Sequence, residues 1–236
     1  MINPFLTAEW KNLIMFNYAT DPSVLLPYLP AHTIPDTYKD THYVSLVGFM
    51  FQHTKVLGVK IPFHINFEEV NLRFYVKRKV NGEWRRGVVF VREIVPKHAI
   101  AFVANNLYSE RYSVMPMRHE VKNGTTLSVR YGWKHKGAWN EMGISTAKMP
   151  VAMQAGSSEE FITEHYWGYN RVSASRTTEY KVEHPKWNYF PVDEYSVDCR
   201  FSELYGNDFA FLNNAKPLSV FMAEGSAISV GKGTRI

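Results

Sequence analysis

The sequence has 236 residues, of which 15% are aromatic and 21% are charged, and its formal net charge is +5 at pH 7. This composition excludes a disordered chain, and the apolar runs are too short to cross a membrane as a helix. The basic residues are scattered and no nucleic-acid-binding motif accompanies them, so neither a membrane nor a nucleic acid is expected as a partner.

The first third of the chain carries patterns that are typical of β-strands. Apolar and aromatic residues at 10–18 and loosely alternating residues at 43–56 predict two strands, and Asp21-Pro22 predicts the start of a short helix between them. Residues 67–95 predict a hairpin, because Asn81-Gly82 supplies two residues that accept positive φ in a tight type I′ turn.

The register of this hairpin predicts which side chains face the core. If the turn closes directly, Phe74 pairs with Val89 and Val70 pairs with Glu93. Glu93 then shares the apolar face and ends it, and a carboxylate aimed at a core needs a partner, a proton or water. The residues that we expect on the inner face are Leu72, Phe74, Val89 and Val91.

The remaining elements complete a β-rich pattern. Pro96 ends the hairpin and predicts a helix at 97–108, Asn123-Gly124 predicts a second hairpin, and Ser157 to Glu160 predict a capped helix at about 159–166. Further strands are expected at 177–183, 195–199 and 218–223. Many strands and few short helices predict a mainly β (β-rich α+β) fold with a mostly antiparallel, closed or nearly closed sheet, in a single domain that spans residues 1–236.

Lys97 is the sharpest candidate for chemistry. The positive end of a helix dipole opposes an ammonium group, and a neighbouring His98 or Arg92 adds to this effect. A desolvated lysine in such a place attacks a carbonyl and forms a Schiff base, whereas the alternative is a lysine whose amine lies in water. Arg92 and Glu93 are either a carboxylate clamp beside an acid/base group or a pair of structural charges.

Other polar residues suggest binding more than catalysis. Glu68 and Glu69 are adjacent on a strand and point to opposite faces, so only one can point inward. His165 and Tyr169 lie in an aromatic segment at 164–169 that either lines a ligand pocket or packs in the core. The nine histidines fit no metal-binding spacing and no phosphate loop is present, so no metal and no cofactor is expected.

The cellular compartment is predicted from cysteine usage. Cys199 is the only cysteine, which excludes an internal disulfide and fits a reducing cytoplasm. Residues 1–10 also lack the basic start and apolar run of a secretory signal. We therefore expect a cytoplasmic protein.

Four runs of sequence resemble a known bacterial family. They lie at 43–49 (YVSLVGF), 67–76 (FEEVNLRFYV), 86–96 (RGVVFVREIVP) and 164–169 (EHYWGY). They are similar to the domain-of-unknown-function family 2071, and the resemblance covers the chain from Phe5 to about Gly225. The family's fold is regarded as similar to that of acetoacetate decarboxylase, a cone-shaped antiparallel β-barrel that encloses a catalytic lysine.

This resemblance implies roles for several residues. The decarboxylase pattern Gly-Arg-Glu, a spacer and Pro-Lys-Lys resembles Arg92-Glu93, a shorter spacer and Pro96-Lys97-His98. By this resemblance Lys97 stands at the Schiff-base lysine and His98 replaces the second lysine. Lys11 falls near the substrate-binding arginine, and Glu68 or Glu69 lies near one active-site glutamate. The strand at 43–49 has no acid where the decarboxylase carries another.

Two functions follow from the sequence and the resemblance. The first is binding of a small carbonyl or carboxylate compound, with Schiff-base lyase chemistry of the decarboxylase type at a cavity lysine. The second is a non-catalytic barrel that binds an apolar or aromatic small ligand or serves as an assembly module. In both, a small molecule is the expected partner, and a homo-oligomer is compatible with either.

Overall fold

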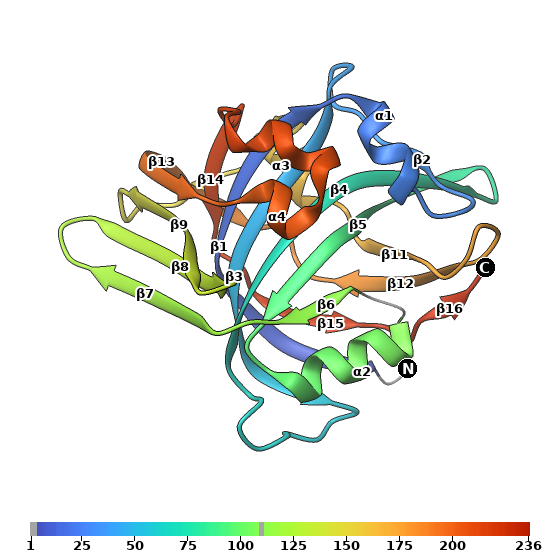
Figure 1. The fold of residues 1–236 in the computed structure, drawn as a ribbon, viewed down its shortest axis with the longest axis horizontal. Helices are drawn as coiled ribbons and strands as arrows, with labels where there is room; N and C mark the ends of the chain where they lie inside the picture. Colours follow the sequence, from blue (N-terminus) through green and yellow to red (C-terminus); the bar gives the residue numbers. More distant parts are fainter. Residues whose placement is uncertain (1–3, 109–110) are drawn as a thin grey trace.

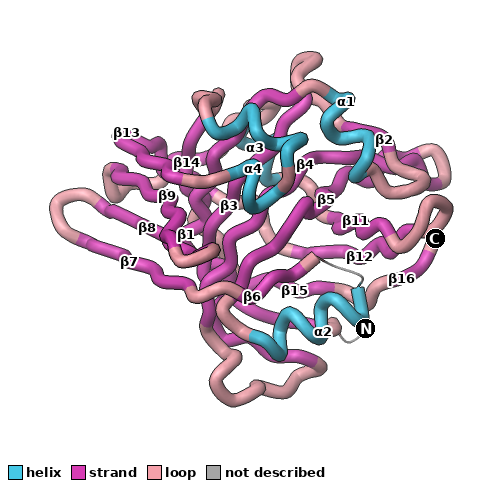
Figure 2. Tube along the Cα trace, viewed as in Figure 1, coloured by secondary structure: helices cyan, strands magenta, loops and turns pink. Residues whose placement is uncertain are grey.

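The structure is a computed structural model that describes residues 4–108 and 111–236. The strands are β1 (Leu6–Thr20), β2 (Ile34–Pro35), β3 (His42–Val56), β4 (Phe67–Val80), β5 (Glu83–Val95), β6 (Tyr112–Val114), β7 (Met117–Asn123), β8 (Leu127–His135), β9 (Ala138–Thr146), β10 (Val151–Ala152), β11 (Trp167–Arg171), β12 (Thr177–Glu183), β13 (Asn188–Asp198), β14 (Ser219–Ala223), β15 (Ala227–Val230) and β16 (Thr234–Arg235). The helices are α1 (Pro22–Leu25), α2 (His98–Tyr108), α3 (Ser158–Thr163) and α4 (Phe201–Tyr205), with the 3-10 helices η1 (Leu26–Tyr28) and η2 (Asn207–Asn213). Strands dominate the fold, as the sequence predicts (Figure 2).

The barrel is closed through strand β1. The order β15-β12-β11-β5-β4-β3-β1 returns to its start because residues 6–9 of β1 pair with β15. Residues 13–17 of β1 pair instead with β14, which begins an extension sheet, β14-β13-β9-β8-β7. This extension projects from the barrel beside the early strands (Figure 1). Most pairs are antiparallel, while β5 pairs in parallel with β6 and β11. The mainly β, mostly antiparallel closed sheet is therefore confirmed.

The part of the barrel wall that includes β3 is buried on both of its faces. An inner core fills the barrel around residues such as Val47, Phe49 and Phe67. An outer core lies between the barrel wall, the extension sheet and α4, and includes Trp133 and Phe201. Residues 43–51 of β3 are consequently all buried, which explains why their sequence alternates only loosely.

Left-handed residue pairs form the tight turns between β4 and β5 and between β8 and β9. Asn81 and Gly82 have φ values of 51° and 89° and join β4 to β5, so the first hairpin is confirmed. The second hairpin, β7–β8, also forms around the predicted position. The next left-handed pair is Lys136–Gly137, with φ values of 46° and 83°, and it joins β8 to β9.

A β-bulge in β5 changes which residues face the inside of the barrel. The strands pair as predicted up to Phe74 and Val89, but the register then shifts so that Val91 is an extra residue on β5. Glu93 lies opposite Asn71, and the predicted pair of Val70 with Glu93 is wrong. One extra residue reverses the facing of the side chains beyond it, which a direct continuation from the turn cannot anticipate.

The predicted inner face of the hairpin is buried, but it faces outward. Leu72, Phe74, Val89 and Val91 all belong to the outer core. The opposite face of β5 carries Val88, Phe90 and Glu93 toward the inside of the barrel. The prediction failed because both faces are buried, so an apolar face does not by itself identify the inner side.

Helix α2 crosses one end of the barrel, and α1 and α3 lie toward the other (Figure 1). Helix α4 covers the outer core. Among the helices that the structure describes, α2 is the longest at 11 residues, and none is long and apolar enough to span a membrane.

The parallel contact between β5 and β11 depends on Gly87. A Cβ at this position would overlap the backbone oxygen of Trp167 and lie 2.6 Å from Cε2 of Tyr169. We expect Gly87→Ala to lower the free energy of unfolding by about 2 kcal/mol through overpacking, measured by urea denaturation. Gly143→Ala on β9 is the control, since its Cβ would have ordinary contacts at 3.4 Å or more, and its effect should be smaller. Equal effects of the two substitutions would contradict this account of the β5–β11 contact.

Candidate functional site

A cavity of about 140 Å³ lies inside the barrel. Most of its wall comes from the strands of the closed ring, and helix α2 adds Ala99 and Ile100 at one end. Most of the wall is apolar, and its aromatic members include Trp10, Phe49, Phe51, Phe67, Phe90 and Trp187. A mostly apolar cavity with a few polar groups is the usual form of a small-molecule site.

Strand β4 supplies much of the polar part of the wall. Residues at spacing two share one face of a strand, so Glu69, Asn71 and Arg73 all face the cavity. The bulge adds Glu93 from β5. The polar side chains of the described wall include Glu69, Asn71, Arg73, Glu93, Tyr112, Thr163, His165, Tyr180 and His184.

Two carboxylates lie on neighbouring strands at the α2 end of the cavity. The side chain of Asn71 donates to Oε1 of Glu69 at 2.9 Å, and the hydroxyl of Tyr112 donates to Oε2 at 2.8 Å. Glu93 pairs across the sheet with Asn71 on one side and with Tyr112 on the other. Both glutamates are almost completely buried. Positioned carboxylates in such a cavity are suited to proton transfer.

Arg73 is the only lysine or arginine among the described residues that line the cavity. Its Nη2 donates to the backbone oxygen of Ile162 at 3.3 Å, and its guanidinium carbon lies 5.6 Å from the ring centre of Tyr75. Its Nε is buried and has no hydrogen-bond partner in the described chain. Arg73 therefore retains a buried donor for an anionic or carbonyl oxygen.

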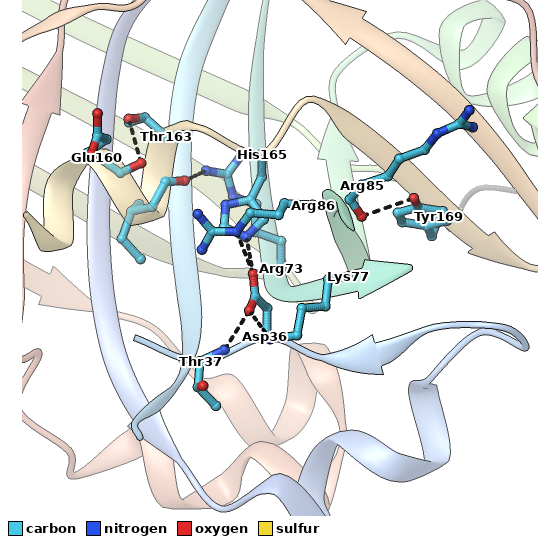
Figure 3. A network of polar contacts seen from close by, with 11 residues as sticks. Asp36, Thr37, Arg73, Lys77, Arg85, Arg86, Glu160, Thr163, His165 and Tyr169 are labelled. Carbon is cyan, nitrogen blue, oxygen red and sulfur yellow. Dashed lines mark hydrogen bonds and ion pairs between the residues drawn. The ribbon is translucent and has the colours of Figure 1, made fainter. Parts of the chain in front are cut away.

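His165 joins the cavity to a charge network around the buried Asp36 (Figure 3). Its Nε2 lies 3.3 Å from Oδ2 of Asp36, which also accepts from Nε of Arg86 at 2.7 Å. The ammonium of Lys77 lies 3.0 Å from Oδ1 of Asp36. Asp36 directly follows strand β2, and the backbone N–H of Asp36 donates to the carbonyl of Tyr75 on β4.

Burial and these contacts shift both pKa values of the pair. Burial lowers the pKa of His165 to about 4, because desolvation of the imidazolium outweighs its hydrogen bond to Asp36. Burial opposes the charge of Asp36, but hydrogen bonds from His165, Arg86 and Lys77 lower its pKa well below the usual range. At neutral pH, His165 is a neutral imidazole and Asp36 is a carboxylate.

Three of the sequence-predicted site residues line the cavity. These are Glu69, Glu93 and His165. Glu93 reaches the cavity through the bulge and not through the parity that it was expected to share with Val89 and Val91.

Lys97 lies directly before helix α2 at the edge of the site. Its backbone carbonyl accepts from the N–H of Ala101 at 3.2 Å, and its side chain is partly exposed. In the described chain, the cavity wall includes Ala99 and Ile100 from this segment but not Lys97. The catalytic role of Lys97 stays a prediction.

The other predicted residues lie away from the cavity wall. Arg92 pairs with Leu72 on the outer face, Glu68 contacts Nδ1 of His119 at 2.6 Å, and Lys11 pairs with Glu9 near the surface. His98 is exposed, whereas Tyr169 is buried in the outer core. Their roles in ligand binding stay predictions.

Several cavity residues were missed at the level of sequence. Arg73 and Asn71 had a usable signal, because they continue the spacing of Glu69 as polar residues in an otherwise apolar strand. Tyr112, and Asp36 as the partner of the cavity residue His165, had none, since short strands bring them from distant parts of the chain. Among the described residues, no group of three or more His, Cys, Asp or Glu side chains could hold a metal ion.

Residues 7–227 match the domain-of-unknown-function family 2071, which is described as an uncharacterized conserved protein. The chain belongs to this family. None of the curated protein sequences matches this member of family 2071.

Solved structures show which fold this family member has. It is similar to the enduracididine biosynthesis enzyme MppR complexed with pyruvate, at a TM-score of 0.69 and 13% identity over 100% of this chain and 91% of that chain. It is similar to acetoacetate decarboxylase from Legionella pneumophila, with a TM-score of 0.66 and 13% identity over 100% of this chain and 88% of that chain. It is also similar to an acetoacetate decarboxylase-like enzyme from Sphingomonas wittichii, with a TM-score of 0.67 and 12% identity over 100% of this chain and 94% of that chain. The acetoacetate decarboxylase type of fold is therefore confirmed.

Proposed function

We propose that the barrel cavity binds a small carbonyl or carboxylate compound with an apolar or aromatic body. The observation that carries this proposal is the buried Nε of Arg73, which lines the cavity without a hydrogen-bond partner in the described chain. A buried guanidinium donor is costly unless an acceptor occupies it, and a carboxylate is its best geometric match. Strands β4 and β5 hold this group on a closed barrel wall.

The size and the wall of the cavity support a narrower class of ligand. Its volume of about 140 Å³ is close to the ~150 Å³ of an engineered apolar cavity that binds benzene. Aromatic walls around Phe49 and Trp187 favour a flat or branched apolar body, with the charged end at Arg73. Pyruvate, which the MppR structure holds, belongs to the same class of small oxo acids and supports the proposal.

Schiff-base chemistry at Lys97 is the finer form of this proposal. It requires the Lys97 amine to turn from its partly exposed position into the end of the cavity next to Ala99 and Ile100. The resemblance of Arg92-Glu93 and Pro96-Lys97 to the decarboxylase pattern supports it. In that form, Glu69 and Glu93 would move protons at the same end of the cavity.

Replacement of Arg73 tests the binding proposal. We expect Arg73→Met to weaken binding of benzoylformate, an aromatic oxo acid, by about tenfold to a hundredfold, because a charge-assisted hydrogen bond contributes about 1.5–3 kcal/mol. Isothermal titration calorimetry measures the effect. Arg171→Met is the matched control, since Arg171 also donates to a backbone carbonyl, that of Pro27, but lies outside the cavity wall. Equal affinities of the wild type and both variants would contradict the proposal.

Borohydride reduction tests the Schiff-base form separately. The protein is incubated with borohydride and a panel of β-keto acids and small aldehydes, and peptides are then mapped by mass spectrometry. An adduct at Lys97 that is absent in Lys97→Ala is the expected result. Binding without any adduct would overturn the Schiff-base form and leave the binding function in place.

A further inference from the structure

In the His165–Asp36 pair, one ring nitrogen of His165 has no hydrogen-bond partner in the described chain. Nε2 of His165 is held by Asp36, and Nδ1 is buried with no hydrogen-bond partner in the described chain. The side chain of His165 is fully buried and the residue lines the cavity. A buried polar atom without a partner costs free energy, which a ligand group can recover.

The charge network fixes the tautomer of His165. An ionised Asp36 is only an acceptor, so Nε2 must carry the proton that it donates, and the neutral ring then presents Nδ1 as an acceptor. Arg86 and Lys77 hold Asp36 in its ionised form on the other side. The free nitrogen is therefore an acceptor, and it cannot serve as the donor that an oxo or carboxylate oxygen requires.

Packing fixes the orientation of the ring. Its centre lies 4.8 Å from the ring centre of Tyr75 and 5.0 Å from that of Phe161, with the Phe161 ring nearly perpendicular. Arg73 holds the same segment from inside the cavity through the carbonyl of Ile162. An acceptor at His165 and a donor at Arg73 therefore belong to one rigid part of the wall.

We propose that Nδ1 of His165 accepts a hydrogen bond from a hydroxyl group of the ligand, so that the cavity selects small hydroxy acids over oxo acids of the same size. This inference rests on the proposed function, because it assumes that the ligand's carboxylate lies at Arg73. Asp36 acts as a positioning residue that holds the acceptor tautomer. An oxo ligand would leave Nδ1 unpaired, whereas a hydroxy ligand satisfies it.

Mandelate and benzoylformate form a matched pair for the test. They share the carboxylate and the phenyl ring, and they differ in one group, which is a hydroxyl in mandelate and an oxo group in benzoylformate. Benzoylformate cannot form an enol, so it has no hydroxyl of its own to donate. We expect the better enantiomer of mandelate to bind the wild-type protein about tenfold more tightly than benzoylformate. His165→Phe should reduce this ratio to about one, while both acids still bind through Arg73. His64→Phe, at a histidine outside the cavity wall whose Nδ1 lies 2.8 Å from the carbonyl of Pro62, should leave the ratio unchanged.

A measurement on the wild-type protein avoids dependence on the folding of a variant. The ¹⁵N resonance of His165 Nδ1 should be that of an unprotonated nitrogen in the free protein, and it should shift with mandelate but not with benzoylformate. Equal binding of the two acids, or an unchanged Nδ1 resonance with mandelate bound, would overturn the inference while the proposed function stands. Failure of both acids to bind would overturn the proposed function and this inference together.

Discussion

Replacement of Asp36 by alanine is expected to lower the free energy of unfolding by about 3 kcal/mol, which is among the largest effects of any single substitution in this chain. Asp36 is almost fully buried and is the common partner of His165, Arg86 and Lys77. Its removal leaves His165 with neither nitrogen paired and places two cationic groups beside each other without their counter-ion. The effect is kept from being larger because Arg86 and Lys77 are partly exposed and can reach water.

The control for this substitution is an exposed ion pair. Glu183 contacts the ammonium of Lys181 at 2.6 Å, but both side chains are more than half exposed. Glu183→Gln should therefore change the free energy of unfolding by less than about 1 kcal/mol in the same urea titrations. A loss for Asp36→Ala no larger than that of the control would show that the network around Asp36 does not stabilise the fold.

Acidification from pH 6.5 to pH 4 is expected to remove about 3 kcal/mol of stability through His165 alone. Burial lowers the pKa of His165 to about 4, whereas the unfolded chain takes up this proton near pH 6.5. In this window the unfolded state binds the proton and the folded state does not, so the free energy of unfolding falls as the pH falls. Each unit of difference corresponds to about 1.4 kcal/mol.

The variant His165→Gln isolates this contribution. A glutamine amide can still donate to Asp36 but does not titrate, so the fall between pH 6.5 and pH 4 should be about 3 kcal/mol smaller than in the wild type. The lowered pKa of Asp36 acts in the same direction but at lower pH, where the unfolded chain protonates this carboxyl and the folded chain does not. Urea titrations at half-unit steps of pH measure both slopes. Parallel curves for the two proteins would contradict a neutral buried His165.

The sequence predicted local structure well where a short motif decides the backbone. Asn81-Gly82 between two strands strongly favours a type I′ turn, and it forms the expected hairpin turn. Ser157 caps helix α3 by accepting from the N–H of Glu160, as its spacing indicates. The closed β-rich architecture followed from many such strands and turns and from the family resemblance.

The facing of side chains was harder to predict, because it depends on features that leave no mark in the sequence. The bulge at Val91 occurs within an apolar run of β5, where an inserted residue resembles its neighbours. Residues 6–9 of β1 close the barrel and residues 13–17 begin the extension sheet, and both pairings are with strands more than 200 residues away. The sequence did not indicate which face of the hairpin points to the cavity, because the outer core buries the other face as well.

The candidate site was only partly predictable for the same reason. Glu69, Glu93 and His165 were identified from their local surroundings, whereas Asp36 reaches His165 across 129 positions of the chain. Arg73 was overlooked because its signal, a polar residue at spacing two from Asn71, is short. The family resemblance pointed to Lys97, whereas the geometry of the cavity points to Arg73 and His165.

A crystal structure of the protein soaked with mandelate tests the central claim most directly. The proposed function predicts density for the acid inside the barrel, with its carboxylate within hydrogen-bond distance of Arg73 and its ring against the aromatic wall near Phe49 and Trp187. The hydroxyl should lie within hydrogen-bond distance of Nδ1 of His165. An empty cavity at a saturating concentration of the acid, or an acid bound inside with its carboxylate away from Arg73, would contradict the account.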